Sequence, residues 1–306
     1  MTTLFLVNPY AGGGRCLAAW RQVAPIAEAH FPGARTVYTS RAGEESTVAA
    51  DVRREGGVDL LVTVGGDGTF HGVVNGLLGE GLPPFRAGFA VAPLPLGTGG
   101  DFARGLGYPA EPAAALDMLV AARRTYVDVG KITFGGERPG RVRYWVNQSY
   151  VGLGAKVVDR VNRAPRWRGG HSYVFSSLLE AMRAHPLEVE LDGDGAVKVP
   201  TRLVNMIVAN GRYSGKGMLT SPSSNPSDGS FEVITIDPMS RLKLLRGLQK
   251  FRDGSYLQLP GVKQWRARSL LIEGKGELVE ADGEIVGNLP ARYEILPRAL
   301  QILAPP

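Results

Sequence analysis

The sequence predicts a chain of two domains: a doubly wound parallel α/β domain over residues 1–126 and an antiparallel β-sandwich over residues 127–290. The first part alternates short apolar runs with helical patterns, which is typical of a parallel sheet covered by helices on both faces. The second part carries short runs rich in Val, Ile, Leu and Tyr between Gly, Pro, Asn and Asp, which is typical of antiparallel strands. A length of 306 residues suits two domains of roughly 150 residues. We expect the tail, residues 291–306, to return to the first domain.

Helix and strand patterns alternate in order along the first domain. Strands are expected at four short apolar runs: 4–7, 36–38, 59–64 and 89–92. Helices are expected at three stretches with apolar residues at helical spacing: 15–29, 44–55 and 70–78. Gly33 follows the first helix, and Gly56 and Gly57 follow the second, in keeping with the preference for glycine just after a helix. The crossovers between these parallel strands are expected to be right-handed.

Strand patterns dominate the second domain. Six short apolar segments are expected to be strands: 141–151, 187–191, 201–209, 230–236, 268–273 and 277–287. Two segments have helical patterns, 172–184 and 239–252, and the tail ends in a strand-like run, Leu300 to Leu303. Asp194 and Gly195 read as an ordinary hairpin turn.

Three glycine-rich turns follow predicted strands of the first domain, at residues 8–14, 65–69 and 97–101. Because the carboxyl ends of parallel strands meet at one edge of a sheet, we expect the three turns to converge. Glycine lets backbone N–H groups approach an anion closely, and the N-termini of the following helices add partial positive charge. The sequence therefore predicts a phosphate-binding site, although a single turn of this kind would more often only connect a strand to a helix.

Motifs that the sequence lacks narrow the type of phosphate site. There is no G-x-x-x-x-G-K-[ST] motif, which excludes a P-loop NTPase. The first lysine of the chain is Lys131, so the first domain has neither a P-loop lysine nor the strand lysine of protein kinases. A dinucleotide-binding fingerprint is weak, because no G-x-G-x-x-G motif opens the first βαβ unit. Arginine, backbone N–H groups and a metal ion would have to balance phosphate charge there.

The composition indicates a globular protein with a basic surface. The formal net charge of +6 favours an anionic partner: a nucleotide, a nucleic acid or an acidic membrane. No recognised nucleic-acid-binding motif accompanies this charge, so we expect no nucleic-acid partner. No apolar run is long enough for a transmembrane helix, and the start lacks the basic region of a signal peptide. Cys16 is the one cysteine and no zinc-ligand spacing occurs, so we expect a cytoplasmic location.

Several motifs follow one another in a fixed order along the chain. They are Asn8-Pro9 with Gly12, Gly65-Gly66-Asp67-Gly68-Thr69 with Val74-Asn75-Gly76-Leu77, Pro95-Leu96-Gly97-Thr98 with Asp101-Phe102-Ala103-Arg104, Asn210-Gly211 with Gly215 and Gly217, Ser227-Asp228-Gly229-Ser230-Phe231, and Asp282-Gly283-Glu284. This order resembles the diacylglycerol kinase catalytic-domain family, which includes soluble bacterial lipid kinases and the sphingosine and ceramide kinases. The GGDGT motif alone is shared with NAD kinases and phosphofructokinases. The resemblance therefore rests on the ordered set, which spans nearly the whole chain.

The resemblance implies a first domain like that of NAD kinases and phosphofructokinases, with ATP as the phosphate donor and Mg²⁺ as a cofactor. The implied nucleotide-binding residues are Asn8, Pro9, Tyr10, Ala11, Gly12, Thr39, Gly65, Gly66, Asp67, Gly68, Thr69, His71, Thr98 and Asp101. A metal ion is implied in the second domain at Asp228, with backbone carbonyls near Asn225 and Ser230, since magnesium prefers hard oxygen ligands. Asp67 would lie near the phosphates and help to position magnesium through water.

Asp282 and Glu284 are implied to face the acceptor hydroxyl. If they lie two apart in one strand, both side chains point to one face. We predict that Glu284 is the general base, because its longer side chain reaches further, and that Asp282 supports it; Asp67 is the second candidate.

Several of these residues also fit structural roles. The Asp-Gly pairs at 228–229 and 282–283 are ordinary hairpin turns in many proteins, and Asp101 could cap the helix that follows it. Gly100 stands where the family usually has Asn, and His71 stands where Asn is common. The effect of these two departures on catalysis stays open.

Two basic clusters with apolar neighbours fit docking to an anionic membrane. The first comprises Arg160, Arg163, Arg166 and Arg168, with Trp167, Tyr173, Phe175, Leu178 and Leu179. The second comprises Arg241, Lys243, Arg246, Lys250 and Arg252, with Leu242, Leu244, Leu245, Leu248 and Phe251. Both also fit a solvated basic face over a buried apolar stripe. Docking would place the protein at the inner face of the membrane.

The function expected from the sequence is an ATP- and magnesium-dependent lipid kinase acting on a lipid such as diacylglycerol at a membrane surface. Sphingoid bases, phosphatidylglycerol and glycolipids also offer a hydroxyl, so the acceptor stays open. One alternative is an NAD kinase-like enzyme, against which the ordered motifs at both ends of the chain argue. Another is a non-catalytic nucleotide- or lipid-binding regulator, which Gly100 and His71 motivate. The oligomeric state is also open, since a strand edge could pair two chains into a homodimer.

Overall fold

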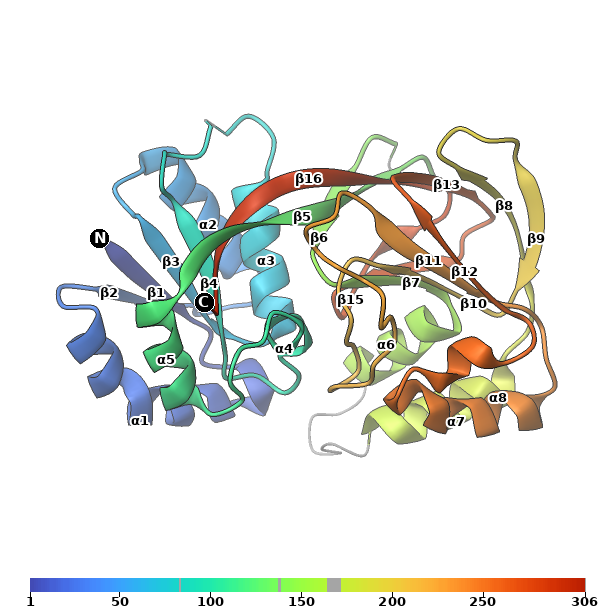
Figure 1. Ribbon diagram of the computed structural model, residues 1–306, viewed down its shortest axis with the longest axis horizontal. Coiled ribbons are helices and arrows are strands. Elements are labelled where there is room, and N and C mark those ends of the chain that lie inside the picture. The colour runs from blue at the N-terminus through green and yellow to red at the C-terminus, as the bar shows by residue number, and fades with distance from the viewer. Residues whose placement is uncertain (83, 137–138, 164–171, 306) are drawn as a thin grey trace. The chain divides into compact units, whose positions relative to one another are not determined.

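The contacts between residues divide the chain into two compact units. Figure 1 shows the chain coloured by residue number, from blue at the N-terminus to red at the C-terminus. The computed structural model describes residues 1–82, 84–136, 139–163 and 172–305. The first unit comprises Met1–Val127 and Arg298–Pro306, and the second comprises Asp128–Pro297. The C-terminal segment thus returns to the first unit from Arg298, whereas the sequence placed the start of the returning tail at residue 291.

The first unit is built on a parallel sheet. Its N-terminal strands are β1 (Thr3–Val7), β2 (Arg35–Tyr38), β3 (Leu60–Gly65) and β4 (Ala90–Pro95). They pair in the order β2-β1-β3-β4, and every pair is parallel. The end of β16 (Ala291–Ala304) pairs in parallel with β4 through Ile302 and Val91. β1 and β3 are buried along their whole length, as strands covered on both faces must be.

Helices cover both faces of this sheet. They are η1 (Ala11–Gly13), α1 (Arg15–His30), α2 (Glu44–Glu55), α3 (Asp67–Leu77), α4 (Asp101–Gly105) and α5 (Pro112–Ala121). α1 packs with α5, and α2 packs with α3. Phe5 and Val7 share a core cluster with Trp20 of α1 and Leu116 of α5, while Leu6, which points to the opposite face, is also buried. The doubly wound α/β domain expected from the sequence is confirmed.

The second unit is an antiparallel β-sandwich, as the sequence predicted. One sheet has the order β12-β11-β10-β7-β14-β15; the other joins the first part of β16 to β13, β8 and β9, with β5 paired to β16 and β6. The bounds are β5 (Arg123–Phe134), β6 (Val142–Trp145), β7 (Gln148–Gly152), β8 (Leu187–Gly193), β9 (Val199–Leu203), β10 (Asn205–Ala209), β11 (Phe231–Ile236), β12 (Val262–Ala267), β13 (Ser269–Glu273), β14 (Leu278–Ala281) and β15 (Glu284–Asn288).

Aromatic side chains fill the core between the two sheets. The ring centroid of Trp145 lies 6.3 Å from that of Phe231 and 6.4 Å from that of Tyr293. Gly130 pairs with Trp145 across β5 and β6, and a Cβ on Gly130 would lie only 2.0 Å from the indole ring. Glycine at this strand position therefore makes room for the largest side chain of the core.

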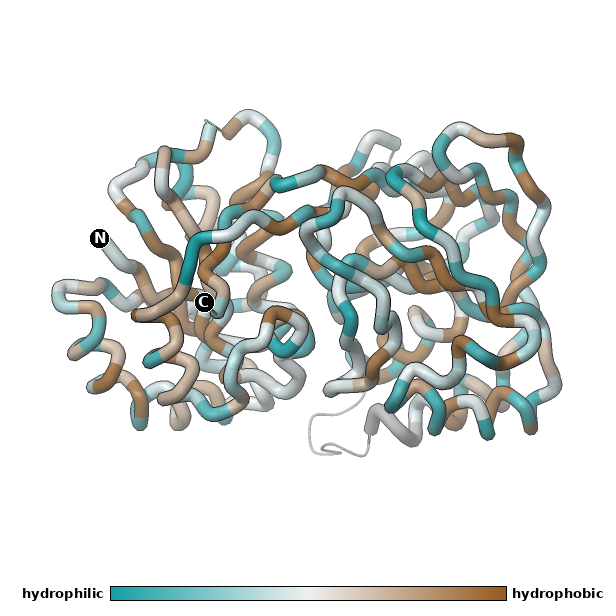
Figure 2. The backbone as a smooth tube through the Cα atoms, in the orientation of Figure 1, coloured by the Kyte–Doolittle hydropathy of each residue, from teal (hydrophilic) through white to brown (hydrophobic). Residues whose placement is uncertain are grey.

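Helices cover the outer face of the sheet that contains β10 and β11. They are α6 (Leu153–Arg163), α7 (Ser172–Arg183) and α8 (Arg241–Leu248), followed by the short turns η3 (Gln249–Arg252) and η4 (Ser255–Gln258). Ile207 and Ile234 of this sheet share a core cluster with Ala181 of α7, Leu244 of α8 and Tyr256 of η4. In Figure 2, brown marks the hydrophobic residues along the strands of the second unit, and hydrophilic and hydrophobic residues alternate along helix α8. None of the helices in the described ranges could cross a membrane.

Three of the predicted strands are each two strands in the structure. The apolar runs 141–151 and 201–209 each pass from one sheet to the other, since β6 and β9 belong to one sheet and β7 and β10 to the other. The residues on both sides of each switch are buried, and no Gly or Pro separates the two strands, so the sequence pattern does not show the break. The run 277–287 is the hairpin of β14 and β15.

Candidate functional site

The three glycine-rich turns of the first unit contact one another. Gly65 at the end of β3 pairs with Pro95 at the end of β4, so the turns that follow leave the same edge of the sheet. A Cβ on Gly97 would lie 2.3 Å from the Gly66 Cα, and a Cβ on Gly12 would lie 3.7 Å from the Gly97 carbonyl carbon. The convergence expected from the sequence is therefore present, and position 97 has no room for any side chain.

Two helix N-termini at this edge offer backbone N–H groups to an anion. α1 follows Gly14 and α3 follows Gly66, so neither N-cap residue has a side chain that could cap its helix. Gly12, Gly13 and Gly14 have φ angles of 63°, 72° and 90°, in the left-handed region that favours glycine. An uncapped helix N-terminus behind a glycine-rich turn is a favourable place for a phosphate group.

Asn8 connects the first turn to the second. Its Nδ2 donates to the Thr69 Oγ1 at 3.0 Å, and its Oδ1 accepts the Tyr10 N–H at 3.0 Å. Its own N–H donates to the Val64 carbonyl at 2.9 Å. A Cβ on Gly65 would lie 2.5 Å from the Thr69 Oγ1, so glycine here leaves room for the hydroxyl that Asn8 binds.

The other predicted nucleotide-binding residues differ in exposure. Tyr10 and Thr98 are exposed, whereas Thr39 and His71 are buried. The His71 Nε2 lies 3.2 Å from the Asn75 Nδ2, so this side chain contacts its own helix. The side chains of Thr39 and His71 therefore face the interior of the unit. Of the remaining predicted residues, Pro9 lies in the first turn, Ala11 begins η1, and Gly68 is in the first turn of α3.

Asp67 holds the third turn in place. Its Oδ2 accepts the N–H groups of Gly100 at 2.7 Å and Asp101 at 3.2 Å, and its Oδ1 accepts that of Phe102 at 3.2 Å. These are the first N–H groups of α4, so the Asp67 carboxylate caps this helix. The sequence offered Asp101 as the cap; the structure instead buries Asp101 in the first turn of α4. A Cβ on Gly99 would lie 2.6 Å from the Asp67 Oδ2, which explains the glycine there.

Asp282 binds a neighbouring loop in the second unit. Its Oδ2 accepts the Val146 N–H at 2.9 Å, and its Oδ1 accepts the N–H groups of Asn147 at 2.9 Å and Gln148 at 3.2 Å. These donors stabilise the negative charge of a carboxylate that is only 7% exposed. Asp282 therefore fixes the backbone that links β6 to β7.

The hairpin geometry separates Asp282 from Glu284. Asp282 and Gly283 have φ angles of 49° and 92° and form the two-residue turn between β14 and β15. Glu284 is the first residue of β15 and is exposed, whereas Asp282 is buried. The expectation that both carboxylates share one strand face is therefore wrong, because the chain reverses between them.

Two further side chains hold this turn. The Gly283 N–H donates to the Glu280 Oε1, and the Asn162 Nδ2 of α6 donates to the Gly283 carbonyl at 3.0 Å. Glu280 is fully buried, and its Oε2 has no hydrogen-bond partner among the described residues. Burial raises the pKa of Glu280 well above its ordinary value, and the charges of Asp282 and Glu284 raise it further. Burial therefore favours the neutral form of Glu280.

The Asn-Gly motif at 210–211 supports the same loop. The Asn210 Nδ2 donates to the Asp128 carbonyl at 3.0 Å and to the Val146 carbonyl at 2.8 Å. A Cβ on Gly211 would lie 2.1 Å from the Asn147 Oδ1. Asn210 thus joins two backbone segments, and Gly211 leaves the space that Asn147 occupies.

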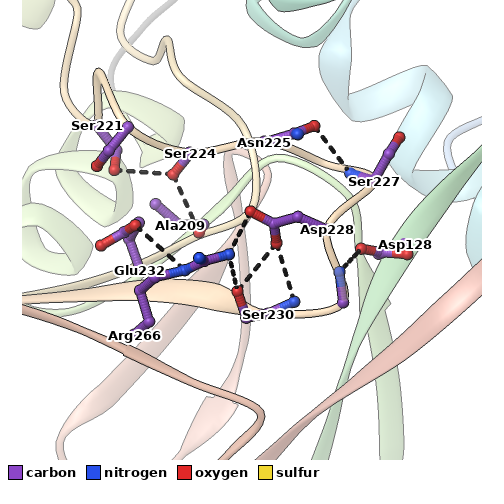
Figure 3. Close-up of polar contacts among 12 residues, drawn as sticks. Asp128, Ala209, Ser221, Ser224, Asn225, Ser227, Asp228, Ser230, Glu232 and Arg266 are labelled. Carbon is purple, nitrogen blue, oxygen red and sulfur yellow. Dashed lines mark hydrogen bonds and ion pairs between the residues drawn. The ribbon is translucent and has the colours of Figure 1, made fainter.

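The predicted metal site lies in a loop with many internal contacts (Figure 3). The Asp228 Oδ1 accepts the Ser230 N–H at 3.1 Å and the Ser230 Oγ at 2.9 Å, while its Oδ2 pairs with the Arg266 guanidinium. The Asn225 Oδ1 accepts the Ser227 N–H at 3.2 Å. Within the described ranges, no group of three or more His, Cys, Asp or Glu side chains could hold a metal ion. The Asp228 carboxylate therefore does not fit a magnesium site in this arrangement, because both of its oxygens bind protein donors. The roles of the backbone carbonyls near Asn225 and Ser230 stay a prediction.

An apolar cavity of about 450 Å³ lies in the second unit, between a sheet and the helices that cover its outer face. Its walls include Tyr150, Val204 and Ile236 from the sheet and Val157 and Leu248 from α6 and α8. This volume is within the range of about 300–1,000 Å³ that is usual for small-molecule sites. The structure thus provides a pocket with mainly apolar walls for an apolar group.

Sequence reasoning missed Glu280, Asn162, Arg266 and this cavity. Alternation could have found Glu280, because it lies between the core residues Val279 and Ala281 and must point to the opposite face of its strand. The cavity had no such signal, because its walls come from segments far apart in the chain. The predicted cluster members Arg166, Trp167 and Arg168 lie outside the described residues.

Comparison with known proteins gives the same order of domains. Residues 2–132 match the model of the diacylglycerol kinase catalytic domain, and residues 147–304 match the YegS C-terminal NAD kinase beta sandwich-like domain. The chain is 31% identical over 303 residues to a diacylglycerol kinase from Mycobacterium tuberculosis (strain ATCC 25618 / H37Rv), covering 98% of this chain and 94% of that protein. It is 27% identical over 274 residues to a diacylglycerol kinase from Staphylococcus aureus (strain Newman), covering 88% of this chain and 82% of that protein.

Solved structures share the fold along the whole chain. The crystal structure of a diacylglycerol kinase from Bacillus anthracis str. Sterne superposes with a TM-score of 0.73 at 23% identity and covers 100% of this chain and 97% of that chain. A second crystal structure from the same organism gives a TM-score of 0.78 at 25% identity. The converging turns, the Asp-Gly-Glu hairpin and the similarity over nearly the full length agree: the chain belongs to the diacylglycerol kinase family.

Proposed function

We propose that this chain is a lipid kinase, which transfers the γ-phosphate of ATP to the hydroxyl group of a lipid of the diacylglycerol class. The names of its relatives support the donor and acceptor classes. The observation that carries the proposal is the apolar cavity of the second unit. An NAD kinase would need a polar site for its acceptor, whereas this cavity offers mainly apolar walls.

The nucleotide side of the proposal rests on the converging turns. ATP would place its phosphates against the N-termini of α1 and α3, where glycine backbone approaches closely. The hydrogen bond between Asn8 and Thr69 would hold the first two turns together. Asp67 would hold the third turn in place by capping α4. These contacts support positioning of the donor, which is the main part of catalysis in phosphoryl transfer.

The acceptor side rests on the cavity and the hairpin turn. An acyl chain in the cavity would gain about 0.8 kcal/mol for each buried methylene group. In the reaction, the lipid oxygen would bond to the γ-phosphorus, the bond from that phosphorus to the β-phosphate oxygen would break, and ADP would leave. Glu284 would take the hydroxyl proton, because its exposed carboxylate is the one that the hairpin presents to solvent. Asp282 would support it by fixing the 146–148 backbone.

Magnesium belongs to the proposal as the ion that accompanies ATP. Its usual chemistry in kinases is to neutralise phosphate charge. The Asp228 loop does not fit that ion, so we assign it no magnesium-binding role.

We further propose that the second basic cluster docks on an anionic membrane surface. Arg241, Lys243, Arg246, Lys250 and Arg252 are all exposed on α8 and η3. Leu242 of α8 is 56% exposed, and Leu178 and Met182 are 44% and 50% exposed on the adjoining α7. Basic groups beside exposed apolar side chains suit the interface of an acidic bilayer. Docking there would bring the protein to a lipid acceptor.

Phosphate transfer to a total lipid extract tests the proposed function. The full chain is incubated with labelled ATP, magnesium and the extract, and the labelled product is identified by mass spectrometry. We expect the phosphate ester of diacylglycerol or of a related lipid alcohol. Labelled NADP in a parallel reaction with NAD would instead indicate an NAD kinase. Nucleotide binding without any labelled product would indicate a regulator.

The general base is tested by Glu284→Gln, which keeps the size of the side chain but removes its basicity. We expect kcat to fall by about 100-fold or more while ATP affinity stays unchanged. Glu277→Gln, in the loop before β14, is the matched control. Near-normal kcat in Glu284→Gln together with an inactive Asp67→Asn would transfer the base role to Asp67.

A further inference from the structure

A single arginine lies between the acidic side chains of the Asp228 loop (Figure 3). The Arg266 Nη2 pairs with the Asp228 Oδ2 and also donates to the Ser230 Oγ at 2.5 Å. The Arg266 Nε lies 3.7 Å from the Glu232 Oε1. Arg266 of β12 pairs with Glu232 of β11 in the sheet register, so the backbone itself directs the guanidinium to this place.

The rest of the loop is held by bonds that also need no metal. The Gly229 N–H donates to the Asp128 Oδ2 at 2.6 Å, and Asp128 is only 1% exposed. The Glu232 Oε2 accepts from the Gln264 Nε2 at 2.8 Å. Each of the three carboxylates around the loop therefore binds a protein donor.

We propose that Arg266 is the built-in cation of this loop, and that the loop takes its folded form without a divalent metal ion. The inference concerns the position at which the family resemblance implies a metal, and it holds whatever the acceptor of the proposed kinase is. The planar guanidinium offers several N–H donors at fixed angles and suits a carboxylate with a hydroxyl beside it.

A magnesium ion at Asp228 would have to remove this arrangement. The ion would lie within a few ångströms of the Arg266 charge, which repels it strongly at short range. It would also have to give up bound water, which magnesium does reluctantly, for an Asp228 Oδ1 that already accepts two hydrogen bonds from Ser230. Expelling the guanidinium would leave Glu232, which is 6% exposed, without its neighbouring positive charge.

Metal titration of the nucleotide-free protein tests the inference without using kinase activity. MgCl₂ and MnCl₂ are titrated into the full chain, and heat of binding and melting temperature are measured. We expect no saturable binding and no metal-dependent rise in the melting temperature of the wild-type protein. Saturable binding that Asp228→Asn abolishes would overturn the inference. A failed proposed function would not change this result, because no substrate is present.

Arg266→Gln tests the role of the guanidinium directly. We expect its melting temperature to fall by about 2–4 °C, and millimolar Mg²⁺ or Mn²⁺ to restore part of the loss by binding the carboxylates of Asp228 and Glu232 in place of the guanidinium. Arg268→Gln, on an exposed residue just beyond the same strand, is the matched control and should melt like the wild type. An Arg266→Gln protein that melts like Arg268→Gln would overturn the inference. If Arg266→Gln does not fold, the metal titrations of the wild type and of Asp228→Asn still test the inference.

Discussion

Aspartates of this chain that resemble catalytic residues bind backbone N–H groups. Asp67 accepts three N–H groups at the start of α4, and Asp282 accepts three from the 146–148 loop. A carboxylate used in this way is held in one orientation by its donors, and its oxygens are already engaged in hydrogen bonds. The motifs thus keep their aspartates for the shape of the site as much as for its chemistry.

Gly97 and Gly66 give a matched pair of substitutions at the contact between two turns. Gly97→Ala places a Cβ 2.3 Å from the Gly66 Cα, whereas a Cβ on Gly66 would lie 3.4 Å from the Gly97 Cα, an ordinary contact. We expect Gly97→Ala to lower the free energy of unfolding by about 1–3 kcal/mol and to weaken ATP binding, because the turns must separate. Gly66→Ala should keep wild-type stability. Urea unfolding measures the stability of both variants, and nucleotide titration measures their ATP affinity. Equal stability of Gly97→Ala and Gly66→Ala would contradict the close contact between Gly97 and Gly66.

Glu280 should make the stability of the protein depend on pH. Its pKa in the folded state is raised by burial above the ordinary 4.5, so the folded protein holds this proton more tightly than the unfolded chain. The contribution of Glu280 to the free energy of unfolding is therefore fully present below about pH 4.5. It falls as the pH rises toward the raised pKa, by up to about 1.4 kcal/mol per pH unit. We expect Glu280→Gln to gain stability relative to wild type between pH 5 and pH 8. Urea unfolding at both pH values measures the gain.

The control for this prediction is Glu188→Gln, which changes an exposed glutamate of β8. Its stability relative to wild type should not vary with pH in the same way. A constant difference between Glu280→Gln and wild type from pH 5 to pH 8 would show that Glu280 is ionised in the folded protein.

Elements with a clear period were predictable from the sequence, and elements defined by tertiary contacts were not. Residues 15–29 and 44–55 were expected as helices and are α1 and α2, with bounds that differ by at most one residue. α6 was missed, since it begins directly after Gly152, the last residue of β7, with no loop between the two elements. The 277–287 hairpin was expected as one strand because Asp282-Gly283 lies between two apolar runs that both suit a strand.

Helix α8 provides the test of the cavity. Leu248 lines the cavity, whereas Leu242 of the same helix is exposed. We expect Leu248→Trp to raise KM for long-chain diacylglycerol by about 10-fold or more relative to a short-chain analogue, because the indole fills space that the acyl chain needs. KM for ATP should not change. Leu242→Trp should keep the wild-type ratio of the two KM values in the same detergent micelles. An unchanged ratio in Leu248→Trp would remove the cavity from the acceptor site.

At the scale of the whole molecule, the sequence predicted the two domains and the convergence of the three turns. Alternating strand and helix patterns predict parallel strands, whose carboxyl ends lie at one edge of the sheet. The turns that follow these strands can therefore be placed at the site from the sequence alone. The Asp228 loop was less predictable, because the ion pair between Asp228 and Arg266 joins residues far apart in the sequence. The cavity depends on the packing of three helices on a sheet, which a local pattern does not encode.

Competition between two acceptors tests the central claim most directly. Diacylglycerol in detergent micelles and NAD are present at equal concentration with the full chain, magnesium and γ-labelled ATP, and the label is measured in the lipid and aqueous phases. The account predicts label in the lipid phase, in a product with the mass of phosphorylated diacylglycerol, and a loss of most of that label in Glu284→Gln. Label in NADP, or none in either acceptor above the enzyme-free blank, would contradict it.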